Sequence, residues 1–169
     1  QWSDDDAVTH QLDWYRVREA EEWHRLETLK PTEGVLGQHL EAIRLIRQGV
    51  GPDVPVIMTV FTPLSIAGEL AGKVQLMRQH LENHEDEAVG AIAHVTEVFS
   101  AYAVECLNAG ADGLFFATTT WGTTNALTSD QYAKWGRPYD LKVLEAVSGA
   151  SFSPSMSVYS NEIRRPFFA

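Results

Sequence analysis

The chain has 169 residues, of which 44% are hydrophobic, so one domain with a sizeable core is expected. Its formal net charge of -10 argues against nucleic acid and anionic membranes as partners, because like charges repel at range. The single cysteine, Cys106, excludes an intramolecular disulfide. No apolar run reaches the roughly 20 residues that a membrane helix needs, and the first residues lack the features of a signal peptide. These observations predict a cytoplasmic protein.

The first half of the chain predicts two helices followed by a strand. Residues 9–30 carry apolar side chains among many Glu, Arg and Trp residues, which favours a loosely amphipathic helix. A short helix is expected over residues 40–46, and Gly49 and Gly51 should end it. Residues 54–61 are β-branched and almost continuously apolar, as in a parallel strand that is buried on both faces.

The second half repeats this alternation. One helix is expected over residues 65–83, beginning at a capping serine, and a longer one over 86–108. Residues 112–117 predict a second buried strand, and a last helix is expected over 129–147. A helical crossover between two strands forces them to run parallel, either as neighbours or with no more than one strand between them.

The final segment, residues 148–169, differs in composition from the rest. Pro154 and several serines favour irregular structure, although Val158 and Tyr159 could pair as a short strand. The basic pair near the end of this segment is interpreted as a solvated surface feature. The sequence therefore predicts one α/β domain over residues 1–147 and an irregular C-terminal tail over residues 148–169.

Three segments taken together resemble the uroporphyrinogen decarboxylase superfamily. They are VPVIMTVFTPLSIAGELAG (residues 54–72), AGADGLFFATTTWG (109–122) and LTSDQYAKWGRPYDLKVLEAV (127–147). Their order and spacing carry the resemblance, which covers about residues 35–147. It implies half of a TIM (β/α)₈ barrel, with parallel strands and flanking helices. In such barrels the chemistry lies on the loops at the C-terminal ends of the strands.

The expected site therefore lies where the two predicted strands end. The candidate catalytic residues are Glu69 and Thr119, and the candidate substrate-binding residues are Thr59, Phe61, Thr62, Thr118, Thr120, Trp121 and Gly122. Relative to the decarboxylase pattern, Thr59 replaces an aromatic residue and Glu69 replaces a tyrosine. Thr119 occupies the position of the family's serine at the exit of the second strand, and Gly122 occupies that of its following glycine. Glu69 could be a general acid or base if burial raised its pKa, or a surface glutamate in the first turn of a helix.

The resemblance implies a carboxy-lyase of porphyrin biosynthesis that acts on a carboxylated small molecule without a tightly held cofactor. The chain contains no counterpart of the family's arginine-rich motif, early aspartate or late histidine. Decarboxylation needs such groups, because arginines hold the substrate carboxylates and the aspartate stabilises a protonated ring. The chain by itself is therefore expected to be inactive.

Two alternatives stay open. A half barrel exposes strand edges and an apolar inner face, so the chain could be an inactive assembly module that forms a homodimer. The chain could also be a fragment of a corrinoid- or zinc-dependent methyltransferase, because such relatives bind zinc through a His-x-Cys motif and a distant Cys. That motif is absent here. Cys106 is expected to be a small buried side chain and His80, His84 and His94 to be exposed, so no metal site is predicted.

Overall fold

A small parallel sheet organises the fold. The computed structural model describes residues 15–148 and the backbone of residues 158–160. Strands β1 (Ile57–Phe61) and β2 (Gly113–Ala117) are parallel neighbours, which confirms the predicted pairing. Strand β3 (Val158–Ser160) pairs in parallel with β2, so the strand order is β1-β2-β3.

Strand β3 falls within the segment for which irregular structure was predicted, and it contains Val158 and Tyr159, the two residues that the sequence offered as a possible short strand. The physical reason is tertiary: the free edge of β2 offers backbone partners to a short segment that has little strand signal of its own. Residues 149–157 and 161–169, which include the basic pair, lie outside the described residues.

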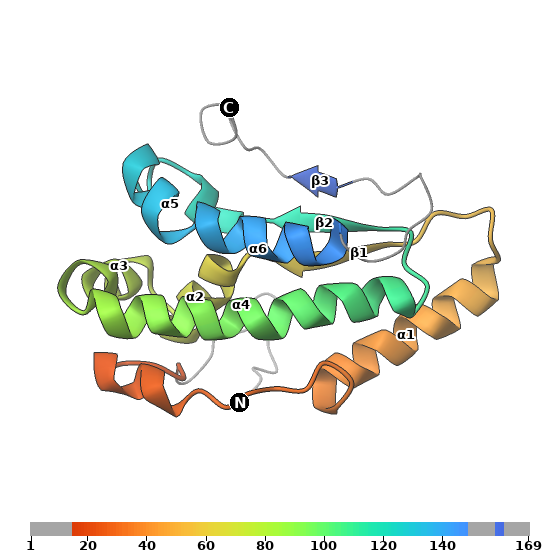
Figure 1. Cartoon of the computed structure of the whole chain (residues 1–169), viewed down its shortest axis with the longest axis horizontal. Helices are drawn as coiled ribbons and strands as arrows, with labels where there is room; N and C mark the ends of the chain where they lie inside the picture. The colour runs from red at the N-terminus through yellow and green to blue at the C-terminus, as the bar shows by residue number, and fades with distance from the viewer. Residues whose placement is uncertain (1–14, 149–157, 161–169) are drawn as a thin grey trace, which may run out of the picture.

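Helices make up most of the described chain. In chain order they are the 3₁₀ helix η1 (Ala20–Arg25), α1 (Gly34–Val50), α2 (Pro63–Ala71), α3 (Val74–Asn83), α4 (Glu85–Asn108), the 3₁₀ helix η2 (Thr119–Gly122), α5 (Ser129–Trp135) and α6 (Arg137–Ser148). Helix α4 belongs to the crossover between β1 and β2, and it packs along α6 beside the sheet (Figure 1). Within the described part of the chain, no helix is long and apolar enough to cross a membrane.

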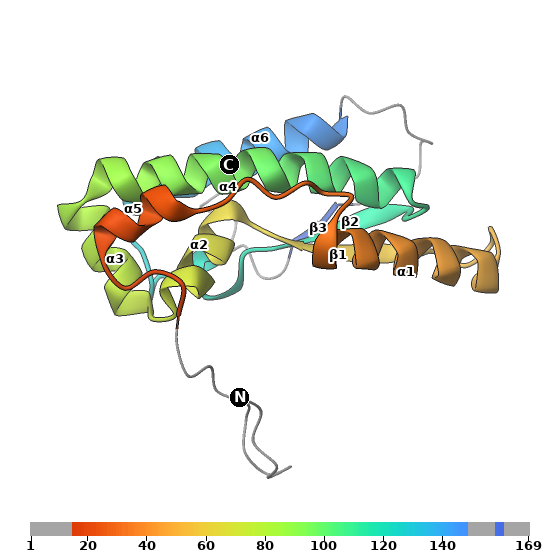
Figure 2. The ribbon, with the colours of Figure 1, turned by 90° about the horizontal axis from the view of Figure 1, so that it is seen from below.

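The prediction of one long helix over residues 9–30 is wrong for residues 15–30, which the structure describes. Only η1 is helical there, and it is a 3₁₀ helix. Val17, Ala20 and Trp23 are buried, at a spacing of three residues. This spacing matches the three residues per turn of a 3₁₀ helix better than the 3.6 of an α-helix. The segment therefore lies along α4 as a short turn between extended stretches (Figure 2).

Two predicted single helices are each broken by a glycine. Gly72 ends α2 with a φ of 73°, in the left-handed region, and a Cβ there would lie 1.9 Å from the ring of Tyr15. Gly136 separates α5 from α6, and a Cβ there would lie 2.6 Å from the ring of Tyr132. In both places an aromatic ring fills the space that a side chain would need. The helical spacing of apolar residues continues across Gly72 and Gly136, so the sequence pattern did not predict that the helices end there.

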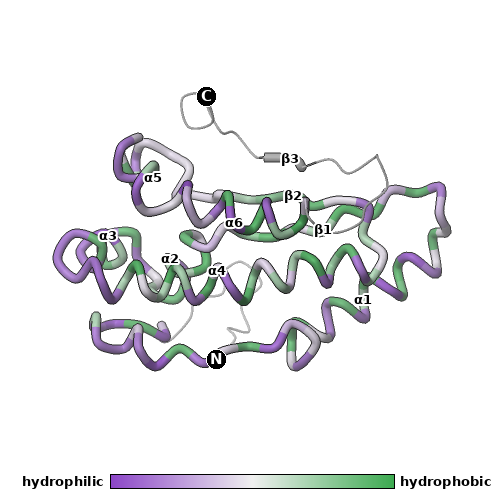
Figure 3. Tube along the Cα trace, viewed as in Figure 1, coloured by the Kyte–Doolittle hydropathy of each residue, from purple (hydrophilic) through white to green (hydrophobic). Residues whose placement is uncertain are grey.

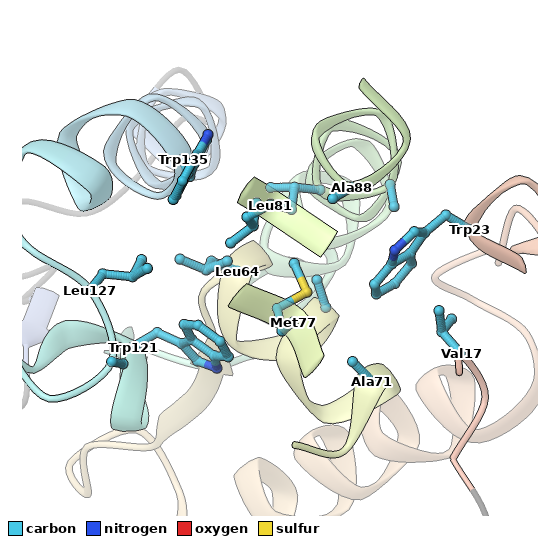
Figure 4. Close-up of a cluster of buried hydrophobic side chains, with 14 of the residues drawn as sticks. Val17, Trp23, Leu64, Ala71, Met77, Leu81, Ala88, Trp121, Leu127 and Trp135 are labelled. Carbon is cyan, nitrogen blue, oxygen red and sulfur yellow. The ribbon is translucent and has the colours of Figure 1, made fainter. Parts of the chain in front are cut away.

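One cluster of buried side chains joins the helices beyond the strand ends. Trp23, Trp121 and Trp135 come from η1, η2 and α5, and Figure 4 shows them around Leu64 and Met77. Large aromatic side chains bury much apolar surface, so a few of them can hold several short elements together. This cluster positions α2 and the loop after β2, which carry the candidate site.

A second cluster lies between the sheet and its covering helices. Val60, Leu114 and Phe116 point toward it from the strands, and Cys106 of α4 and Val143 of α6 meet them. Figure 3 shows the two strands as largely apolar segments beside the more mixed surfaces of α4 and α6. The buried place of Cys106 agrees with the prediction for this residue.

The opposite face of the sheet is uncovered. Ile57 and Phe61 are 41% and 42% exposed, Thr59 between them is exposed, and Phe115 is partly exposed. Side chains of a strand alternate between its faces, so these four form one surface, which we call the open face. The prediction that β1 is buried on both faces is therefore wrong for the described chain, because helices cover only one of them.

The Arg47 side chain of α1 forms hydrogen bonds with the loops at the N-terminal ends of β1 and β2. Its Nε donates to the carbonyl of Gly110 at 2.9 Å, and its Nη1 donates to those of Gly51 and Val54 at 2.8 and 2.9 Å. Its Nη2 pairs with the carboxylate of Asp112. One guanidinium thus ties the end of α1, the entry to β1 and the entry to β2.

Asp112 completes this contact by exchanging two hydrogen bonds with Val56. The N–H of Asp112 donates to the carbonyl of Val56, and Oδ2 of Asp112 accepts the N–H of Val56, each at 2.7 Å. The N–H of Val56 and then the Arg47 guanidinium lower the pKa of Asp112. The carboxylate is therefore ionised at neutral pH and available to both partners.

We predict that Arg47→Met lowers the free energy of unfolding by about 2 kcal/mol, because it removes the side-chain donor of three carbonyls and the cation beside the Asp112 carboxylate. Arg44→Met is the control: Arg44 lies one turn earlier on α1 and only forms an exposed pair with Glu41. That control should cost less than about 0.5 kcal/mol. Urea unfolding followed by circular dichroism measures both, and equal losses would contradict the role given to Arg47.

Candidate functional site

The C-terminal ends of β1 and β2 meet at one edge of the sheet. Thr62 follows β1 directly, and its N–H donates to the carbonyl of Ala117, the last residue of β2, at 3.0 Å. Thr118 follows β2, and both threonines are buried. The structure thus brings together the two exit loops in which the sequence placed the binding residues.

Ser65 of α2 links the two loops through its hydroxyl group. Its Oγ donates to the carbonyl of Thr118 at 2.7 Å, and it lies 2.8 Å from the hydroxyl of Thr62 and 2.9 Å from that of Thr119. The sequence predicted Ser65 as the cap of a helix. The cap is instead Thr62, whose side chain accepts the N–H of Ser65, and this leaves the serine hydroxyl free to join the strand ends.

The directions of these hydrogen bonds follow from counting protons. A hydroxyl group has one proton and two lone pairs. Ser65 gives its proton to Thr118, so Thr62 and Thr119 must each donate to Ser65. The Thr119 hydroxyl therefore offers only lone pairs to a ligand.

Thr119 also has an unusual backbone conformation. Its φ is 51°, and it is the one described non-glycine residue with a positive φ. A β-branched residue rarely adopts this conformation, which costs on the order of 1–2 kcal/mol and is enriched at functional sites. Thr119 is exposed, so the strained residue is accessible to a ligand.

The other predicted residues of the second loop differ in accessibility. Trp121 is only 4% exposed and packs against Gly68 of α2, where a Cβ would lie 2.2 Å from the indole Nε1. Gly122 leaves room for Thr118, because a Cβ there would lie 2.4 Å from the threonine hydroxyl. These two residues position the loop. Thr120 is exposed beside Thr119.

Glu69 lies on the surface of α2 and not in either exit loop. It is the seventh residue of α2, past the first turn, and it is exposed. Glu69 is therefore an exposed surface glutamate, the second of the two interpretations that the sequence allowed, although it lies past the first helical turn. Thr59 and Phe61, in contrast, lie on the open face.

The strand ends carry no charged side chain. Residues 57–65 and 113–123 include no Lys, Arg, Asp or Glu. Substrate carboxylates are usually held by arginine, whose guanidinium forms two parallel hydrogen bonds with them. This part of the site therefore supplies hydroxyl groups and apolar surface, without cations for a carboxylated substrate.

The described side chains do not fit a zinc site of the Cys and His type. Cys106 is fully buried in α4, and burial raises the pKa of its thiol to about 11, whereas zinc binds the thiolate. His80 is buried, which corrects its predicted exposure, and its Nδ1 accepts the indole N–H of Trp23 at 3.0 Å. Within residues 15–148 no three His, Cys, Asp or Glu side chains are grouped to hold a metal ion.

A buried carboxyl group that the sequence did not point to lies between α5 and α6. Asp140 is fully buried, accepts a hydrogen bond from the Tyr132 hydroxyl through Oδ2, and has no partner for Oδ1 among the described residues. Burial raises the pKa of Asp140 from 3.8 to about 7, although the Tyr132 bond opposes this. The protonated form is thus favoured by folding, and this contribution to stability is lost as the pH rises through about 7.

A family model for uroporphyrinogen decarboxylase matches residues 14–162 of this chain. The chain belongs to the uroporphyrinogen decarboxylase family. This confirms the resemblance found in the sequence, and the match extends beyond the residues 35–147 that carried it, into the segment that contains β3.

Within this family, the chain is similar to methyltransferases from methanogens. It is 23% identical over 145 residues to the methylcobamide:CoM methyltransferase MtbA of Methanosarcina acetivorans, covering 86% of this chain and 42% of the relative. It is 36% identical over 78 residues to MtaA of Methanosarcina barkeri, covering 46% of this chain and 23% of the relative. The fold resembles a methyltransferase from Methanosarcina mazei with a TM-score of 0.67 and 24% identity, over 80% of this chain and 38% of that one. The chain spans less than half the length of these relatives.

We predict that Thr119→Gly stabilises the fold by about 0.5–1 kcal/mol, since glycine adopts a positive φ without strain. The matched control is Thr120→Gly, the next residue of the same 3₁₀ helix, which should destabilise by about 0.5–1 kcal/mol because glycine loses more conformational freedom on folding. Thermal unfolding of the two variants compares them directly. A loss of stability in both would mean that the hydrogen bond from Thr119 to Ser65 outweighs the strain.

Proposed function

We propose that this chain is the central part of a (β/α)₈ barrel of the methyltransferase type. Parallel neighbouring strands, a helical crossover and helices on one face support the barrel. In a barrel, the open face would be the inner wall, and the exits of β1 and β2 would form part of the ligand site. The fold similarity to a methyltransferase from Methanosarcina mazei supports the same architecture.

The chemistry of the strand ends favours methyl transfer over decarboxylation. The decarboxylase that the sequence predicted would bind a substrate rich in carboxylates, and the strand ends carry no cation to hold them. The lone pairs of Thr119 suit a ligand with N–H or O–H donors instead. A corrinoid carries amide side chains, which supply such donors. The relatives named for methylcobamide support this choice of substrate class.

The contribution of this chain to such a reaction would be to bind and orient. The hydroxyl of Thr119 would accept a hydrogen bond from the ligand, and Phe61 on the open face would supply apolar contact. Trp121 and Gly122 would hold the loop that presents Thr119. No three His, Cys, Asp or Glu side chains among the described residues are grouped to hold a metal ion, so we assign these residues no step in activating a thiol.

Equilibrium dialysis of the purified chain against methylcobalamin and against uroporphyrin tests this proposal. We predict that methylcobalamin is retained and uroporphyrin is not. Thr119→Val keeps the side-chain shape but removes the acceptor, so it should weaken retention about five- to tenfold. Thr120→Val is the control and should have little effect. Retention of uroporphyrin alone would favour a decarboxylase, and retention of neither would contradict a ligand site on this chain.

We also propose that the 169-residue chain by itself associates as a homodimer through the open face. Ile57 and Phe61 leave apolar surface in water, at a cost of about 25 cal/mol for each Å². The outer edge of β1 has no partner strand among the described residues, so it also favours pairing. A second copy can cover both features by two-fold symmetry.

Light scattering at micromolar concentration measures this association. We predict a dimer for the unaltered chain and a shift toward monomer for Ile57→Lys, which places a charge on the open face. Leu45→Lys, at an exposed apolar position on α1, is the control and should stay dimeric. A stable monomer of 18.8 kDa for the unaltered chain would contradict the proposal.

A further inference from the structure

A pocket of about 370 Å³ lies between the N-terminal segment, α2 and α4. Its wall is mainly apolar, with Leu26, Leu29, Ile66, Leu70, Val98 and Phe99 among the residues that line it. The volume falls within the roughly 300–1,000 Å³ of small-molecule sites, which are typically apolar with a few polar groups. Nothing in the proposed methyl-transfer site uses this pocket.

One wall of the pocket is a strap, which we define as residues 16–29. It lies beside α4 in two perpendicular views (Figures 1 and 2) and is bonded to the helices at three places. These are Val17 N–H to Leu70 O at 3.0 Å, Trp23 Nε1 to His80 Nδ1 at 3.0 Å, and His94 Nε2 to Glu27 O at 3.2 Å. Because the strap is attached along its length, the wall is preformed.

The strap leaves apolar surface uncovered at the pocket. Val17 and Trp23 are buried in the core, but Leu29 at the other end of the strap is 52% exposed and lines the pocket. An exposed leucine that continues an apolar cavity loses contact with water when an apolar ligand enters. Binding of an apolar ligand would therefore be favourable, because it removes this apolar surface from water.

Arg16 supplies the cation at the pocket. One Nη2–H donates to the carbonyl of Arg25 at 3.0 Å. No carboxylate among the described residues forms a close ion pair with the guanidinium, which interacts electrostatically with Glu22, itself paired with Arg25. A guanidinium has five N–H groups, so several are left for a ligand. Glu27 also lines the pocket, with an exposed side chain, and is the one carboxylate among the described residues that line it.

We propose that this pocket binds a small amphipathic anion, with a single apolar chain between α2 and α4 and an anionic head on Arg16. The apolar wall recognises the apolar chain of the ligand, and the Arg16 guanidinium recognises the anionic head. The strap holds both recognition elements on one preformed surface. The proposal does not depend on the methyl-transfer site, so either can fail without the other.

Isothermal titration of the full chain with octanoate and decanoate, each below its micelle concentration, tests the apolar part. We expect saturable binding of octanoate with a dissociation constant on the order of 0.1–1 mM. Decanoate should bind about 15-fold more tightly, since each buried methylene contributes about fourfold. Ile66→Trp fills the pocket and should abolish binding of both. Leu45→Trp, at an exposed position on α1, should leave binding unchanged.

The head group is tested with octanol and octylammonium. The unaltered chain should bind octanoate more tightly than either. Arg16→Gln should weaken octanoate about tenfold, as expected for loss of a charged hydrogen bond, and leave octanol unchanged. Arg25→Gln changes the net charge equally but removes only an exposed partner of Glu22, so octanoate should bind as before.

Several results would overturn the proposal. No saturable binding of either fatty acid would exclude the ligand class, and equal binding by the Ile66→Trp variant would place the ligand elsewhere. Octylammonium binding as tightly as octanoate would remove the role of Arg16. If the Arg16→Gln variant does not fold, the affinities of the unaltered chain for octanoate, octanol and octylammonium still show whether the site prefers an anionic head group.

Discussion

The contact between Arg47 and Asp112 sets the geometry on which the sheet and its exits depend. Asp112 exchanges two hydrogen bonds with Val56, which aligns the entries of β1 and β2. Arg47 joins the same point to α1 and to the loop before β2. Register is maintained along a parallel pair, so alignment at the entries places Phe61 opposite Ala117 at the far end. The exit loops meet for that reason.

This register explains why hydroxyl chemistry lies at the exits. The aligned ends bring Thr62 and Thr118 within reach of Ser65, whose hydroxyl bonds the buried hydroxyl of Thr62 and the carbonyl of Thr118. The cost is the strained backbone of Thr119, whose hydroxyl donates inward and presents lone pairs outward. One fold can serve unrelated chemistries, so the fold alone does not distinguish a methyltransferase from a decarboxylase. The side chains at the strand ends are the basis for preferring one hypothesis over the other.

Features that depend on residues near each other in the sequence were predictable. The apolar runs that contain β1 and β2, and the helical crossover between them, implied parallel strands. The family was also recognisable from three short segments, and the family model matches a longer range. The burial of Cys106 followed from its place in a helix of apolar periodicity. The local sequence pattern is enough for such features, because side chains repeat with a fixed period along a helix or a strand.

The tertiary structure decided what depends on residues far apart in the sequence. The ring of Tyr15 fills the space at Gly72, so one predicted helix became two. The indole of Trp23 binds His80, so a histidine that looked exposed is buried. Ser65 became the link between two strand ends because Thr62 took the capping role that the sequence pattern had given to the serine. The sequence by itself determined the strands and the family, and long-range packing decided which side chains meet.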